Sequence, residues 1–167
     1  MLARPDLSEG WYELGRVQLA AGEFEAALAS FERARQLVPA EPRYRCEMAK
    51  ALIKLQRRDE AIAQLEQAVK LGPDFWEAHS LLGEELAFNG RIDDAHREFE
   101  KTLRLNPKVA IAHYNLGVVL VKQGQLADAQ REFSEVLRLD PENSMARGAL
   151  AQLERARPSA EGDTRKK

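Results

Sequence analysis

Apolar and small residues return along this chain with a period that fits paired helices. When Ser8 is counted as position 1 of a 34-residue frame, they recur mainly at positions 7, 8 and 11 and again at positions 20, 24, 27 and 30. Residues three and four apart share one face of an α-helix, so each set forms a stripe along one side. The pattern therefore predicts an all-α chain with two amphipathic helices in every frame.

Prolines and glycines indicate where these helices end. A proline recurs every 34 residues, at Pro5, Pro39, Pro73, Pro107 and Pro141. Because proline cannot continue a helix, each one is expected to follow the second helix of a pair. A second column holds Gly22, Gln56, Gly90 and Gly124. It lies between the two helices, where glycine supplies a positive φ at the end of the first helix.

The frame divides the chain without insertion or deletion. The predicted segments are a lead-in at 1–7, repeats at 8–41, 42–75, 76–109 and 110–143, a capping helix at 144–157 and a disordered tail at 158–167. One helix pair cannot bury its own stripe, so neighbouring pairs must stack. The lead-in leaves two interpretations open: a short extension that pads the first repeat, or part of a longer array. The second would leave an exposed apolar face near Trp11 and Val17.

Several columns resemble the signature of a known repeat family. The sequence WYELG at Trp11–Gly15, followed by Ala27, Phe31, Ala34 and Pro39, is similar to the tetratricopeptide repeat, and so is AHYNLG at Ala112–Gly117. The resemblance covers residues 8–143 and implies a right-handed αα-solenoid of four repeats with a C-terminal capping helix. Trp11, Phe99 and Phe133 are expected to anchor the interfaces. Repeat 2 departs most from the family pattern, with Arg45 and Arg58 at positions that are usually bulky or apolar.

The resemblance also implies a concave groove lined by the first helix of each repeat. Its first half has charges of both signs, with a local basic cluster of Arg43, Lys50 and Lys54, and its second half is apolar. Asn115 there can hydrogen-bond a peptide backbone. The residues predicted to bind a partner are Tyr12, Arg16, Arg43, Lys50, Lys54, Leu81, Glu84, Phe88, Ile111, Tyr114, Asn115, Val118, Val121, Lys122 and Met145.

The function predicted from this pattern is a non-catalytic scaffold or adaptor that docks a protein segment in the groove. A partner helix or an extended peptide with apolar anchors suits the apolar half. The alternative is an oligomerisation or regulatory fragment of a longer tetratricopeptide protein, which would self-associate through its exposed N-terminal helix face. A third interpretation is that the apolar groove residues serve packing alone.

Composition and charge narrow the classes of function that remain. Lys and Arg number 25 against 27 Asp and Glu, a net charge of −2, whereas a protein that binds nucleic acid is usually basic. The chain has one cysteine, which excludes an intramolecular disulfide. No apolar stretch is long enough for a membrane span, and Met1–Gly10 lacks the apolar core of a signal peptide. We therefore expect a soluble, cytoplasmic protein with a protein or peptide partner, no nucleic acid and no membrane insertion.

Few residues invite a chemical role. His79 and His113 share position 4, which is a packing position in the family, and no third metal ligand is spaced to join them. Cys46 is expected to be a partly buried small hydrophobe; the alternative is a reactive thiol whose pKa is lowered by Lys50 and Arg43. No motif for nucleophilic, phosphate-binding or dinucleotide chemistry is present. The sequence predicts no catalytic residue, metal or cofactor.

Overall fold

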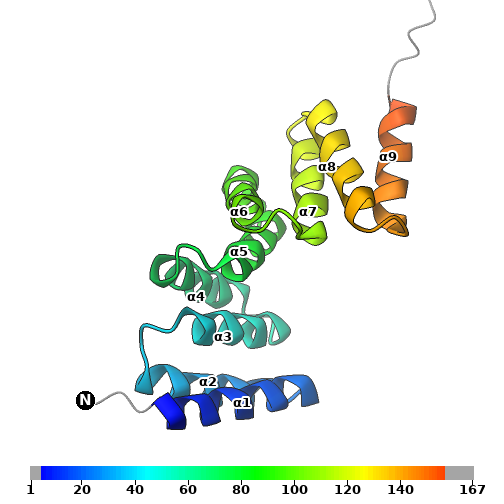
Figure 1. The fold of residues 1–167 in the computed structure, drawn as a ribbon. Helices are drawn as coiled ribbons and strands as arrows, with labels where there is room; N and C mark the ends of the chain where they lie inside the picture. Colours follow the sequence, from blue (N-terminus) through cyan, green and yellow to red (C-terminus); the bar gives the residue numbers. More distant parts are fainter. Residues whose placement is uncertain (1–4, 157–167) are drawn as a thin grey trace, which may run out of the picture. The chain divides into compact units, whose positions relative to one another are not determined.

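A computed structural model of the chain describes residues 5–156, and residues 1–4 and 157–167 lie outside the described part. The described residues form helices and no strand, as predicted (Figure 1). The helices are α1 (Pro5–Ala21), α2 (Phe24–Leu37), α3 (Pro42–Lys54), α4 (Arg58–Leu71), α5 (Trp76–Phe88), α6 (Ile92–Leu105), α7 (Ala110–Lys122), α8 (Leu126–Leu139) and α9 (Ser144–Ala156). The predicted disordered tail at 158–167 and the last residue of the predicted capping helix fall outside the described residues.

The helices recur with the period of the sequence. Helices α3, α5, α7 and α9 begin 34 residues apart, and so do α2, α4, α6 and α8. The turn inside each pair contains a residue with positive φ: Gly22 at 82°, Gln56 at 61°, Gly90 at 77° and Gly124 at 76°. Glycine adopts this conformation without steric cost, which explains the glycine column. The helices thus repeat with the 34-residue period of the frame.

The start of the chain differs from the lead-in that the sequence predicts. Pro5 is the first residue of α1, whereas Pro39 and Pro73 follow the ends of α2 and α4. Proline is tolerated in the first turn of a helix because the amide hydrogen it lacks has no partner there. Residues 5–7 therefore extend the first helix towards the N-terminus.

The chain forms two compact units, Met1–Pro107 and Lys108–Lys167. In the first unit, consecutive helices from α1 to α6 pack against one another, and α3 also contacts α1 and α5. In the second unit, α8 packs against both α7 and α9. Within each unit, neighbouring helices thus cover one another's apolar stripes, as stacking of helix pairs requires.

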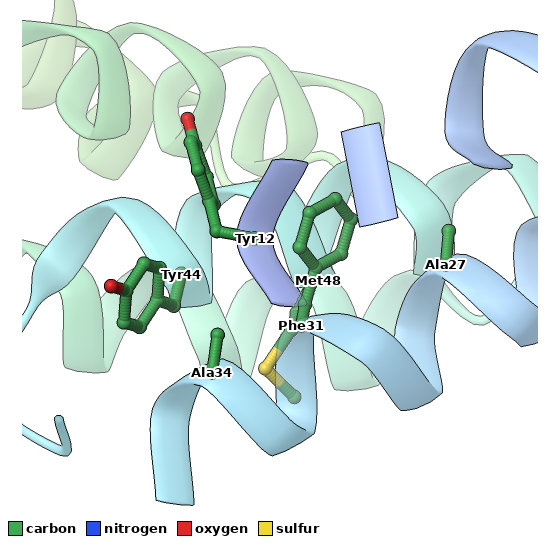
Figure 2. Close-up of a cluster of buried hydrophobic side chains, with 6 residues drawn as sticks. All are labelled: Tyr12, Ala27, Phe31, Ala34, Tyr44 and Met48. Atoms are coloured by element: carbon green, nitrogen blue, oxygen red, sulfur yellow. The ribbon is translucent and has the colours of Figure 1, made fainter. Parts of the chain in front are cut away.

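A buried cluster joins the first three helices. It contains Tyr12, Ala27, Phe31, Ala34, Tyr44 and Met48 (Figure 2). The ring centroid of Tyr12 lies 6.0 Å from that of Phe31 and 5.4 Å from that of Tyr44. The predicted anchor Trp11 is half-buried and packs at the edge of this cluster, whereas Phe31 is fully buried. Phe31 is therefore the central aromatic residue of the first repeat.

Phe31 belongs to a pairing of large and small residues that repeats along the chain. Fully buried phenylalanines at position 24 lie against glycines at position 8, in the pairs Phe31–Gly15, Phe99–Gly83 and Phe133–Gly117. A Cβ atom on these glycines would lie 2.6–2.7 Å from the ring, closer than atoms can pack. Repeat 2 has Leu65 and Ala49 at these two positions. A smaller side chain at one position thus accompanies a larger one at the other.

Candidate functional site

An open hollow of about 430 Å³ lies in the second unit between α7, α8 and α9. Its volume is within the range of small-ligand pockets, about 300–1,000 Å³. Most of its lining side chains are apolar, and the polar ones come from a lysine and a glutamine. The lining residues are Tyr114, Val118, Val121 and Lys122 of α7, Leu126 and Phe133 of α8, and Ala149, Gln152 and Leu153 of α9.

Helix geometry explains why these residues meet. Tyr114, Val118 and Val121 follow one another at spacings of four and three residues, so they share one face of α7. Their neighbours on α9 share a face for the same reason. The ring of Tyr114 packs at a tilt on buried Phe133, with 5.5 Å between centroids, and forms part of the wall. Val121 is 38% exposed, so an apolar surface remains open.

A comparison with the first unit suggests why the hollow exists. Tyr12 and Tyr114 occupy the same position of the frame, but Tyr12 is only 8% exposed because Tyr44 of the next first helix packs on it. The residue of α9 that corresponds to Tyr44 is Ala146. Its methyl group cannot cover Tyr114 as the Tyr44 ring covers Tyr12. Tyr114 is accordingly half-buried, whereas Tyr12 is buried.

The structure brings together only part of the predicted groove set. In the second unit, four of its members, Tyr114, Val118, Val121 and Lys122, line the hollow. Ile111 and Met145 are exposed and Asn115 is half-buried, but none of these three lines it. Sequence reasoning missed the contributions of α8 and α9. The frame could have located Gln152, which occupies the same position on α9 as Val118 on α7.

In the first unit, Tyr12 is buried, whereas the sequence predicts that it is open to a partner. Its ring is buried between Phe31 and Tyr44, and two guanidinium groups lie near it, Arg16 at 5.8 Å and Arg43 at 5.2 Å from the ring centroid. Burial raises the pKa of the Tyr12 hydroxyl. Tyr12 is therefore a core residue that offers a partner little surface.

The predicted basic cluster is largely neutralised. Arg43 pairs with Glu41 at 3.1 Å, and Lys50 pairs with Glu47 at 2.6 Å. Burial by itself would lower the pKa of Lys50, but the hydrogen bond and charge of Glu47 outweigh it, and the pKa lies above its ordinary value. Lys54 is exposed. Acidic neighbours thus compensate two of the three cations. The expectation of a local basic surface is corrected accordingly.

Arg58, one of the unusual residues of repeat 2, packs on the predicted groove residue Phe88. Its guanidinium donates a hydrogen bond to Glu85 at 2.6 Å and lies 3.7 Å from the ring centroid of Phe88. Phe88 is 69% exposed, yet Arg58 lies over its ring. Of the other predicted groove residues on α5, Leu81 and Glu84 are half-buried. The stem and planar head of Arg58 thus pack where the family usually has an apolar residue.

Glu84 is expected to make the free energy of unfolding depend on pH. Burial, followed by repulsion from Glu85, raises the pKa of its carboxyl. The native state therefore binds this proton more readily than the unfolded state, and ionised Glu84 destabilises the fold above the native pKa. We expect Glu84→Gln to increase the free energy of unfolding at pH 7. The gain should shrink as the pH falls through the native pKa and vanish where both states are protonated, as measured by urea unfolding across a pH series.

Glu135→Gln provides a control of opposite sign. The hydrogen bond from Arg138 lowers the pKa of the half-buried Glu135 carboxyl, so its ionised form stabilises the native state. The effect is weak, because the exposed Arg138 leaves the pair screened by solvent. That contribution is present above the unfolded pKa and is lost as the pH falls through the native pKa. The control variant should lose stability at pH 7. If both variants changed stability in the same direction at pH 7, the opposite pKa shifts of Glu84 and Glu135 would be contradicted.

Cys46 and the two histidines have structural roles. Cys46 is 1% exposed, and burial raises the pKa of its thiol to about 12 despite nearby Lys50, so the reactive-thiol alternative is wrong. His79 and His113 are buried, and their Nδ1 atoms lie 2.6 Å and 2.7 Å from the carboxylates of Glu98 and Glu132. Each histidine thereby ties a first helix to the second helix of its pair. Within residues 5–156, no group of three His, Cys, Asp or Glu side chains is arranged to hold a metal ion.

Paired helices at a constant spacing, with a glycine turn and small residues at the crossings, define a tetratricopeptide repeat protein. Residues 1–110 match the family model of the cytochrome c-type biogenesis protein H TPR domain, and residues 88–153 match a further tetratricopeptide repeat model. The chain therefore belongs to the tetratricopeptide repeat family. Members of this family are generally protein–protein interaction modules and typically non-catalytic. None of the described helices combines the length and apolar character that a membrane span requires.

Solved structures agree on the fold. The crystal structure of MamA is 20% identical and matches 84% of this chain and 82% of its own with a TM-score of 0.78. The crystal structure of YrrB, described as a TPR protein with an unusual peptide-binding site, is 25% identical and matches 85% of this chain and 73% of its own with a TM-score of 0.73.

A curated relative is matched over a shorter stretch. The TPR repeat-containing thioredoxin TTL4 of Arabidopsis thaliana is 36% identical over 75 residues, which is 45% of this chain. The chain spans 11% of the length of that protein.

Proposed function

We propose that this chain is a non-catalytic interaction module that binds a peptide segment of a partner protein in the hollow between α7, α8 and α9. The hollow itself is the observation that carries the proposal. It combines an open apolar lining with a volume of about 430 Å³, enough for one or two apolar side chains of a ligand. Removing such side chains and the exposed part of Val121 from water favours binding.

The polar groups at the hollow indicate the chemistry of the peptide. Lys122 is exposed, and none of the described carboxylates lies within ion-pair distance of it, so it can meet an acidic residue of the ligand. The amide of Gln152 can donate to and accept from a peptide backbone. A ligand with two apolar anchors and a nearby aspartate or glutamate fits this arrangement. The peptide-binding site in the description of YrrB supports the same kind of role at the level of the fold.

A random peptide library displayed on phage tests the proposal. The full chain is used as bait, and enriched sequences are synthesised with a fluorescent label and titrated by anisotropy. We expect enriched peptides to combine apolar anchors with an acidic residue and to bind with micromolar dissociation constants. Val121→Glu, which places a charge in the hollow, should raise the dissociation constant about tenfold or more. Lys122→Glu should weaken binding of the acidic peptides selectively.

Val17→Glu is the matched control, since it makes the same change at an exposed valine of the first unit. It should leave the affinity for the peptide unchanged, and circular dichroism should show that both variants remain folded. Enriched peptides that bind the Val121→Glu variant as tightly as the original chain would overturn the proposed site. A library that yields no enriched peptide would overturn the proposed function.

A further inference from the structure

Helix α9 is held in place by few buried side chains. It forms one wall of the hollow, yet among the helices of the second unit only α8 packs extensively against it (Figure 1). Of the side chains described on α9, Ala146 alone is buried, whereas α8 buries Ala129, Phe133 and Val136. Burial of apolar surface supplies most of the free energy that keeps a short helix in place. Helix α9 is therefore held less firmly than α8.

The contacts that hold α9 lie at its start. The side chain of Asn143 accepts a hydrogen bond from the backbone amide of Ala146 at 3.0 Å and so caps the helix. Arg147 pairs with the carboxylate of Glu142 at 3.2 Å. Gly148 comes next, and a Cβ atom built on it would have no neighbour within 4 Å. Because glycine disfavours a helix interior relative to alanine, α9 is weakest from Gly148 onwards.

The residues that α9 contributes to the hollow all follow Gly148. They are Ala149, Gln152 and Leu153. Ala149 and Leu153 are half-buried and Gln152 is exposed. An apolar side chain of a ligand in the hollow would withdraw more of Ala149 and Leu153 from water, and Gln152 could hydrogen-bond the ligand backbone. The least firmly held part of α9 would thus gain contacts from a bound peptide.

We propose that segment 149–155 is a lid, which frays from Gly148 onwards in the free chain and closes as a helix when a peptide occupies the hollow. The inference rests on the proposed function and adds a conformational control of that site. A ligand that contacts only the closed lid favours the closed form by its difference in affinity for the two forms. The apparent dissociation constant is then the intrinsic constant divided by the closed fraction. A change that stabilises the helix beyond Gly148 should therefore tighten binding without touching the ligand.

Gly148→Ala is the variant that tests this coupling, because its new methyl group points into open space. We expect the tightest peptide of the display selection to bind the variant about two- to fivefold more tightly, since alanine raises the closed fraction. Gly10→Ala is the matched control: it makes the same change inside α1, again with no neighbour within 4 Å. It should leave the affinity, measured by anisotropy, unchanged. Equal affinities for the original chain and both variants would overturn the inference.

Amide hydrogen exchange of the full chain tests the lid without a ligand. In the free chain, amides of 149–155 should be protected at least about tenfold less than the central amides of α8, because they exchange through local opening. Gly148→Ala should slow their exchange, and the selected peptide should slow it further. Equal protection of 149–155 and α8 in the free chain would overturn the lid even if the peptide binds. A selection that yields no peptide would instead overturn the proposed function, so the two failures are distinguishable.

Discussion

Replacing Phe99 with alanine is expected to lower the free energy of unfolding by about 3–5 kcal/mol. The side chain is 0% exposed and lies against Gly83 between α5 and α6. Its removal loses the transfer free energy of the ring and leaves a cavity that the surrounding helices can fill only in part. In a stack of repeats each unit depends on its neighbours, so the loss also weakens the interfaces of that repeat.

Urea unfolding followed by circular dichroism measures this effect. Phe88→Ala is the control, because it removes the same ring from a side chain that is 69% exposed, on the neighbouring helix α5. The control should lose much less stability, since little of its ring is withdrawn from water, although the contact with Arg58 disappears. Equal losses for the two variants would contradict the burial of Phe99 on α6 and the exposure of Phe88 on α5.

The second large effect is expected at the glycine that faces this ring. A Cβ atom at Gly83 would lie 2.7 Å from the ring of Phe99, which is fully buried. Overpacking of this kind costs about 1–3 kcal/mol. Alanine is intrinsically favoured over glycine in a helix by roughly 1 kcal/mol, so a net loss in Gly83→Ala would show that packing outweighs helix propensity.

A double-mutant cycle tests the pairing directly. Phe99→Leu alone should destabilise, but in combination with Gly83→Ala the total loss should be smaller than the sum of the two single losses. Repeat 2 already has this combination, with Ala49 and Leu65. Gly148→Ala is the control, because a Cβ atom there has no neighbour within 4 Å, and it should gain up to about 1 kcal/mol. Additive losses at positions 83 and 99 would contradict steric coupling.

Much of the fold could be predicted because its determinants are local. The proline spacing, the apolar stripes and the glycine column each act within a few residues, through missing amide hydrogens, helix periodicity and positive φ. Pro5 shows the limit of such rules. The same residue type at the same frame position begins a helix there and follows one at Pro39. Proline is compatible with both places, so the sequence pattern could not distinguish them.

The candidate site was only partly predictable. The spacing of Tyr114, Val118 and Val121 placed them on one face of a helix, and they do line one hollow. Tyr12 has the same residue type and frame position as Tyr114, yet it is buried because Tyr44 packs on it. Helix periodicity gives the direction of a side chain. It does not give the size of the side chain opposite, which belongs to another helix.

The sequence by itself determined the family, the all-α class and the helix period, because each depends on residues close together in the chain. Only the tertiary structure decided which charges are compensated between helices, as Glu85 of α5 compensates Arg58 of α4, and which apolar faces stay open. It left the hollow beside Tyr114 open and the apolar side chains of Leu14 and Val17 on α1 exposed. Exposure depends on the helix that packs, or does not pack, on a given face, and that contact joins residues distant in sequence.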